Sequence, residues 1–170
     1  MKLPALLLLW SLIICCSPGL IAQSGPSQRP QSDVALKRWV LTEKKLAGEG
    51  NIRAQEELGD FYYFGTGVPQ DFTKAAYWLR KAAEQGDVGA QFEIGDLYFK
   101  GRGVPQSYPR AYFWLDLAAA QASPNTLLGN VPLTEMRDEA ASHLSRTEVL
   151  HVQKRAERWF KSHKSSLSTY

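Results

Sequence analysis

Apolar residues recur along this chain at helical spacing, and the pattern is written twice, 36 residues apart. Apolar positions at i, i+4, i+7 and i+8, or at i, i+3, i+4 and i+7, predict one buried stripe of an α-helix. Four such stripes are Ala54, Leu58, Phe61 and Tyr62; Ala75, Trp78, Leu79 and Ala82; Ala90, Ile94, Leu97 and Tyr98; and Ala111, Trp114, Leu115 and Ala118. A fixed period of this length predicts stacked copies of one helix pair rather than a single closed core.

Glycine, proline and capping residues separate these helices. Gly65 and Gly101 follow the last apolar position of each first helix, where a left-handed residue is favoured. Asp71 and Ser107 are expected to cap the second helices, because both residue types are good N-caps. The glycines and tryptophans that define the repeat are Gly59, Gly65, Gly67, Trp78 and Gly86 in the first copy and Gly95, Gly101, Gly103 and Trp114 in the second.

The helical pattern continues on both sides of the two copies. Residues 33–49, capped at Ser32, match the second helix of a repeat and are expected to shield the first copy from water. Downstream come an irregular insertion and two more helices, which begin near Thr134 and Ser145. Ser145 and Glu148 form a capping box. The sequence therefore predicts seven helices, no strand and an all-α fold.

The N-terminal segment has the layout of a secretory signal peptide. Lys2 precedes an apolar run at residues 5–16, and a helix-breaking Ser-Pro-Gly follows. We expect cleavage near Ala22 and export to the periplasm or medium; the alternative is an N-terminal membrane anchor. Both cysteines, Cys15 and Cys16, lie in this segment, so a cleaved chain has no cysteine and no disulfide.

The chain accordingly divides into eight predicted segments. They are a signal peptide at 1–22, a flexible leader at 23–31, an N-terminal capping half-repeat at 32–52, repeat 1 at 53–88, repeat 2 at 89–123, an insertion loop at 124–133, a C-terminal capping helix pair at 134–162 and a tail at 163–170. The net charge of +3 over 170 residues gives no indication of a nucleic-acid partner.

The repeat resembles the Sel-1-like repeat, a relative of the tetratricopeptide repeat. The first copy, from Ala54 to Gly86, matches the pattern A-x-x-x-L-G-x-x-Y-x-x-G-x-G-V-x-x-D-x-x-K-A-x-x-W-x-x-K-A-A-x-x-G at nearly every position. The second copy departs from it at Ser107, Arg110 and Ala122. The resemblance covers about residues 33–162 and implies a right-handed α-solenoid of helix-turn-helix repeats that serves as an interaction scaffold, often exported.

In this family the first helix of each pair lines the concave face, which implies a candidate binding groove. Its residues are Glu57, Asp60 and Tyr63 from the first copy and Glu93, Asp96 and Phe99 from the second. The carboxylates have two other interpretations. They could form a solvated or capping surface, or act as a catalytic pair of the glycosidase type.

A second candidate surface lies on the last helix. Lys154, Arg155, Arg158 and Lys161 would suit either the helix macrodipole or contact with an anionic lipid, an envelope polymer or an acidic partner. No pair of histidines has i, i+4 spacing on one helix, and no nucleophile or phosphate-loop motif is present. We therefore predict no catalytic, metal or cofactor-binding residue.

The function predicted from these features is an exported, non-enzymatic scaffold that binds another protein or peptide along its concave face. One alternative is a cell-envelope hydrolase, because some cysteine-rich relatives are associated with β-lactam hydrolysis. Those relatives have a disulfide in each repeat, which the cleaved chain could not form. The other alternative is a structural component of an envelope complex.

Overall fold

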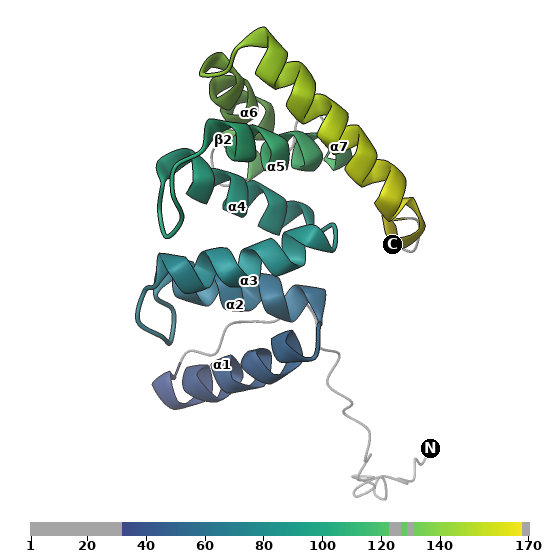
Figure 1. The fold of residues 1–170 in the computed structure, drawn as a ribbon. Coiled ribbons are helices and arrows are strands. Elements are labelled where there is room, and N and C mark those ends of the chain that lie inside the picture. The colour runs from purple at the N-terminus through teal and green to yellow at the C-terminus, as the bar shows by residue number, and fades with distance from the viewer. Residues whose placement is uncertain (1–31, 123–126, 129–130, 168–170) are drawn as a thin grey trace, which may run out of the picture.

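The computed structural model describes residues 32–122, 127–128 and 131–167, which form a curved stack of helices (Figure 1). The elements in chain order are α1 Asp33–Gly48, α2 Ile52–Phe64, α3 Phe72–Glu84, α4 Val88–Lys100, α5 Tyr108–Gln121, β1 Leu127–Leu128, β2 Val131–Pro132, α6 Leu133–Ser142 and α7 Arg146–Leu167. Each helix from α1 to α5 packs against the next one in the chain, and α7 packs against α5. The predicted all-α repeat solenoid is confirmed.

The two repeats begin and end in the same way. Asn51 and Asp87 cap α2 and α4 by accepting bonds from the amides of Ala54 and Ala90, at 2.9 and 2.7 Å. The helices then stop at Gly65 and Gly101, whose φ angles of 72° and 67° lie in the left-handed region. The 36-residue period of the sequence is thus a period of the backbone.

Small residues allow the helices of one repeat to approach closely. A Cβ atom added at Gly59 would lie 2.6 Å from Leu79 Cγ, and one at Gly95 would lie 2.8 Å from Leu115 Cγ. Both leucines are fully buried, in the apolar stripes of α3 and α5. The glycine in the Leu-Gly and Ile-Gly pairs therefore sets the distance between the two helices of each pair.

The C-terminal helix makes the environments of the two repeats different. It packs against α5, and among the described residues α3 has no equivalent third helix against it. Trp114 is consequently buried, with 6% exposure, whereas Trp78 is only half-buried. The prediction that both tryptophans are buried core is wrong for Trp78. The neighbouring Tyr77 is more accessible still, with 45% of its side chain exposed.

Several predicted boundaries also need correction. Ser107 occupies the N-cap position of α5, but its side chain makes no capping hydrogen bond. The insertion contains a two-residue antiparallel pair, β1 with β2, where no strand was predicted. The sixth helix begins at Leu133, which agrees with the predicted start near Thr134. The last helix continues to Leu167, so most of the predicted tail at 163–170 is helical. The signal peptide and the leader lie outside the described residues.

Candidate functional site

Acidic side chains from successive repeats converge on one face of the solenoid. We define the carboxylate face as the side chains of Glu56, Glu57 and Asp60 on α2 and of Glu93 and Asp96 on α4. The two helices present equivalent acidic residues on the same face, because Asp60 and Asp96, and likewise Glu57 and Glu93, are one repeat period apart. The sequence predicted four of these five residues and missed Glu56.

At the centre of this face, the carboxyl groups of Asp60 and Glu93 form a hydrogen bond between the two repeats. Burial first, and then the negative charge and hydrogen bond of Asp60, raise the pKa of Glu93 far above its ordinary value of 4.5. The proton belongs to the pair, because two carboxyl groups in such close contact titrate together. This pair holds a proton, and the two carboxyl groups are not independent surface charges.

Glu56 extends the face toward the α3–α4 turn. Burial and the charges of Asp87, Asp60 and Glu57 raise its pKa to about 7. Its Oε1 atom lies above the backbone of Gly89, where an added Cβ would be only 2.6 Å away. The absence of a side chain at Gly89 thus leaves room for the Glu56 carboxyl group.

Asp96 makes polar contacts in both repeats. It accepts a 3.0 Å hydrogen bond from the Tyr63 hydroxyl of the preceding repeat and pairs with Lys100 at 2.7 Å. Only 5% of Asp96 is exposed, so the interpretation of this residue as a solvated surface charge is wrong. Phe99, also predicted for this groove, is half-buried and packs edge-on against Tyr108, with ring centroids 5.5 Å apart.

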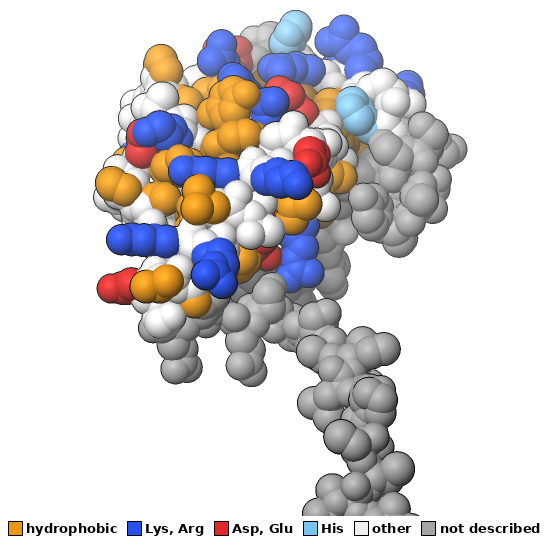
Figure 2. All heavy atoms as spheres, turned by 90° about the horizontal axis from the view of Figure 1, so that it is seen from below, with side chains coloured by type: hydrophobic (Ala, Val, Ile, Leu, Met, Phe, Trp, Pro, Cys, Tyr) orange, Lys and Arg blue, Asp and Glu red, His pale blue; other side chains and the backbone are white. Residues whose placement is uncertain are grey.

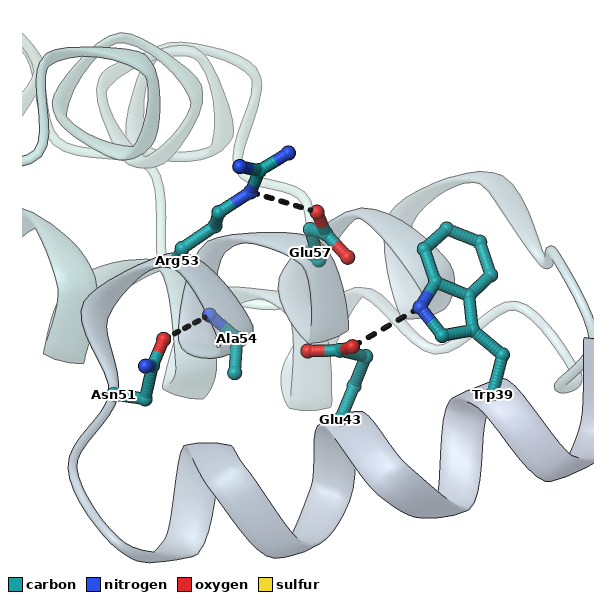
Figure 3. Close-up of polar contacts among 6 residues, drawn as sticks. All are labelled: Trp39, Glu43, Asn51, Arg53, Ala54 and Glu57. Atoms are coloured by element: carbon teal, nitrogen blue, oxygen red, sulfur yellow. Dashed lines mark hydrogen bonds and ion pairs between the residues drawn. The ribbon is translucent and has the colours of Figure 1, made fainter. Parts of the chain in front are cut away.

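Glu57 is the more accessible part of the face, toward α1. It forms an ion pair of 3.1 Å with Arg53, and its side chain is 20% exposed. Opposite it, Glu43 of α1 accepts a 3.0 Å hydrogen bond from the Trp39 indole (Figure 3). Burial and the charge of Glu57 raise the pKa of Glu43. The row of carboxyl groups therefore extends across α1, α2 and α4.

This arrangement suits binding better than acid–base hydrolysis. The two carboxyl groups of a glycosidase lie roughly 5–9.5 Å apart, which leaves room for the reacting bond. Asp60 and Glu93 are in direct hydrogen bond instead. In the described parts of the chain, no group of three or more His, Cys, Asp or Glu residues could hold a metal ion. The same residues contain no helix long and apolar enough to cross a membrane.

A groove of about 990 Å³ lies beside the carboxylate face, along the edge of the solenoid. Its walls are the start of α2, the turn between α3 and α4, and the end of α5. Arg53 and Asp87 contribute the charged groups, and Gln85 and Gln121 the amides. The groove adds a concave recess to the row of carboxyl groups.

The basic residues predicted on the last helix are all exposed on α7. The Arg155 guanidinium lies 4.0 Å from the centre of the Phe113 ring, so this residue also fixes α7 to α5. The side chains of Lys154, Arg158 and Lys161 are exposed on the same side of the helix, which leaves them accessible to a partner.

Each repeat also contains a buried glutamine that was not predicted from the sequence. Gln55 and Gln91 donate to the carbonyl groups of Ala47 and Ala83, and they accept hydrogen bonds from Gln85 and Gln121. The signal was available: an Ala-Gln pair recurs after one period, at Ala54 and at Ala90. A polar residue that recurs inside an apolar stripe indicates a buried, paired side chain.

Stacked helix pairs with a continuous face across successive units define a helical-repeat solenoid, a class of protein that presents an extended surface to its partners. Within this class, residues 52–87 and 88–123 each match the family model of the Sel1 repeat. The chain therefore contains two repeats of the Sel1 repeat family. The fold of this family is a general scaffold for protein–protein interaction.

Two solved structures are similar to the chain. One is the crystal structure of c5321, a protective antigen present in uropathogenic Escherichia coli strains displaying an SLR fold; it is 30% identical, with a TM-score of 0.68, over 81% of this chain. The chain spans only 28% of that protein. The other is a Sel1 repeat protein from Oxalobacter formigenes, 41% identical over 51% of this chain and 66% of that one, with a TM-score of 0.49. A comparison with curated protein sequences gives no significant match.

Proposed function

We propose that this protein is an exported, non-enzymatic scaffold whose carboxylate face holds a positively charged segment of a partner protein. The observation that carries the proposal is the continuity of acidic groups across consecutive helices. The ionisable part of this row consists of Glu43, Glu56 and Glu57. Arg53 is the nearby cation whose charge lowers the pKa values of Glu43 and Glu56. A partner that brings lysine or arginine side chains would offset the surplus of acid.

The preorganised helices support the same proposal. The hydrogen bonds between Asp60 and Glu93 and between Tyr63 and Asp96 join repeat 1 to repeat 2 and fix the spacing of the face. A rigid surface of this kind binds an extended segment without the cost of ordering the scaffold.

The proposal is tested by a matched pair of charge reversals. Glu57 pairs with Arg53 on the carboxylate face, and Glu84 pairs with Arg80 on α3, each at i, i+4. Glu57→Lys and Glu84→Lys therefore remove the same kind of ion pair, each worth about 0.3–0.5 kcal/mol of stability. Partners recovered from native envelope extract by the wild-type protein are identified by mass spectrometry. We expect Glu57→Lys to lose them and Glu84→Lys to retain them; equal binding by both variants would contradict the proposal.

Export is part of the proposal and has its own measurement. The support is the sequence of residues 1–22, with Lys2, the apolar run and Ala22. We expect the protein secreted by its host to begin at Gln23 when sequenced by mass spectrometry. Recovery of intact Met1 in the membrane fraction would favour the anchor.

The basic surface of α7 favours a second candidate function, the docking of an anionic polymer or an acidic partner of the cell envelope. Three exposed cations on one side of the helix support it. Reversal of Lys154, Arg158 and Lys161 to glutamate is expected to release the protein from envelope fractions at low salt. Arg155 is left unchanged because it also packs on Phe113. Unchanged retention of the triple variant would exclude this surface.

A further inference from the structure

The first helix of the solenoid has two different sides. Its inner side packs against α2 and buries Val40, Glu43 and Ala47. On the outer side, Val34 and Leu41 are 73% and 65% exposed, more than any other large hydrophobic side chain in the described part of the chain. Residues seven apart in a helix lie on the same side. The two side chains therefore form an apolar stripe that has no partner among the described residues.

Basic residues flank this stripe. Arg38 follows Val34 by four residues and Lys45 follows Leu41 by four, which places each cation one turn from an apolar side chain. Lys37 lies at the edge of the same side and is exposed. We define the outer face of α1 as Val34, Lys37, Arg38, Leu41 and Lys45.

Acidic groups are scarce on this face. Of the two acidic residues in α1, Asp33 is in the first turn, and Glu43 is buried on the inner side, bonded to Trp39. Figure 2 shows the molecule from below, the side on which α1 lies in Figure 1, with Lys and Arg side chains spread among hydrophobic ones. The outer face is therefore both basic and apolar.

The sixth helix, near the other end of the stack, is built differently. The exposed residues of α6 include Glu135, Asp138 and Glu139, and none of its exposed side chains is a large hydrophobic one; the neighbouring α7 exposes one, Leu150, at 48%. A polar outer face is what a terminal unit of a solenoid needs for solubility. The apolar residues on the outer face of α1 are an exception to this rule, and capping alone does not explain them.

We propose that the outer face of α1 docks on the surface of a lipid bilayer that contains anionic lipids. Helices that lie in the membrane interface combine Lys and Arg with a few large apolar side chains. Lys37, Arg38 and Lys45 would contact lipid phosphates, and Val34 and Leu41 would enter the boundary between headgroups and acyl chains. A symmetric contact between two copies is less favourable, because it would bring the same cations face to face.

The position of α1 in the chain is consistent with docking on a bilayer. The apolar run at residues 5–16 precedes α1, and residues 17–32 can span at most about 55 Å. If the run is kept as an anchor, it would hold α1 within this distance of a membrane surface. The proposal goes beyond protein binding by the carboxylate face and uses none of its residues.

The test places a photoreactive side chain on the full chain, so that any membrane contact of residues 5–16 is common to all samples. One variant is Leu41→p-benzoylphenylalanine. Its matched control is Leu150→p-benzoylphenylalanine, because Leu150 is an exposed leucine of α7, at the other end of the solenoid. Each is irradiated with vesicles of phosphatidylcholine alone or mixed with phosphatidylglycerol. We expect lipid adducts from position 41 on the anionic vesicles, at least tenfold more than on the neutral ones, and few from position 150.

Charge variants of the Leu41 photoprobe provide the second measurement. Lys37→Gln, Arg38→Gln and Lys45→Gln together are expected to reduce the lipid adducts at least tenfold, whereas Lys154→Gln, Arg158→Gln and Lys161→Gln leave them unchanged. Circular dichroism checks that each variant is folded, and the comparison of the two vesicle types does not depend on these variants. Adducts from position 41 to a second protein copy, equal adducts on neutral vesicles, or adducts only from position 150 would each overturn the proposal.

Discussion

Gln121 donates a hydrogen bond of 2.8 Å from its side-chain amide to Oε1 of Gln91. Gln91 in turn donates to the carbonyl group of Ala83, at 3.2 Å, and is fully buried. The same relationship joins Gln85 to Gln55 at 2.7 Å. In each repeat, the glutamine at the end of the second helix bonds to the buried glutamine of the first helix. The buried glutamine bonds in turn to a carbonyl group in the last turn of the preceding helix. The pair therefore satisfies a polar backbone group at the junction between units.

Replacement of the buried glutamine should destabilise the fold although no apolar contact is removed. Gln91→Met keeps the length of the side chain but leaves the Ala83 carbonyl group and the Gln121 amide without this partner. We expect a loss of about 1–3 kcal/mol in the free energy of unfolding, measured by urea denaturation. The control is Gln106→Met, which removes an exposed bond to the Phe99 carbonyl group that water can replace. Equal losses in the two variants would show that the buried hydrogen bond contributes no more to the free energy of unfolding than the exposed one.

The carboxyl pair between the repeats predicts a pH dependence. Because the pKa of Glu93 is raised in the folded state, the folded protein keeps a proton that the unfolded chain releases above its ordinary pKa of 4.5. The free energy of unfolding therefore falls as the pH rises from about 4.5 toward the raised pKa. Glu56, with a pKa of about 7, contributes the same trend between about 4.5 and 7.

Glu93→Gln mimics the protonated form and should remove part of this dependence. We expect a higher melting temperature than wild type at pH 8 and a difference that shrinks toward pH 5. Glu148→Gln is a control of opposite sign, because hydrogen bonds from Ser145 lower the pKa of Glu148. In the wild type, ionised Glu148 stabilises the folded state above pH 4.5, and this contribution is lost as the pH falls through its lowered pKa. A Glu93→Gln variant that is less stable than wild type at pH 8 would contradict the shared proton.

The two equivalent tryptophans should differ in their contribution to stability. Trp114→Ala removes a buried side chain and is expected to cost about 3–5 kcal/mol. Trp78→Ala should cost distinctly less, because Trp78 is half-buried and contacts the exposed Tyr77. Chemical denaturation of both variants measures the difference. Similar losses would mean that α7 does not protect α5 in solution.

The tryptophan pair also shows where sequence periodicity stops being informative. The period placed Trp78 and Trp114 at equivalent positions in α3 and α5, and the structure confirms that placement. The difference in burial arises from α7, whose partner across the fold is set by packing and not by local pattern. A hydrogen bond from Gln153 to the Tyr112 hydroxyl, at 3.1 Å, helps to fix α7 there.

In the candidate site, too, periodicity predicted the positions of residues but not their contacts. The duplicated acids Asp60 and Asp96 were visible as a pattern, and so was their place on the first helix of each pair. Their partners were not, because the contact between Asp60 and Glu93 depends on how far one repeat is rotated against the next. Periodicity identifies which residues share a face, whereas the offset between units decides which of them are solvated and which share a proton.

The last prediction concerns the turn that connects α4 to α5. Gly103 has a φ of 68°, and an added Cβ would collide with the backbone carbonyl group of Phe72 at the start of α3. Gly103→Ala therefore combines a strained backbone with a clash that no side-chain rotation can relieve. We expect a loss of at least about 2 kcal/mol in unfolding free energy. Gly48→Ala is the matched control: it lies in α1, has open space around its Cα and should be stabilising by up to about 1 kcal/mol. If Gly103→Ala were as stable as wild type, the packing of this turn on the preceding repeat would not contribute to holding the units together.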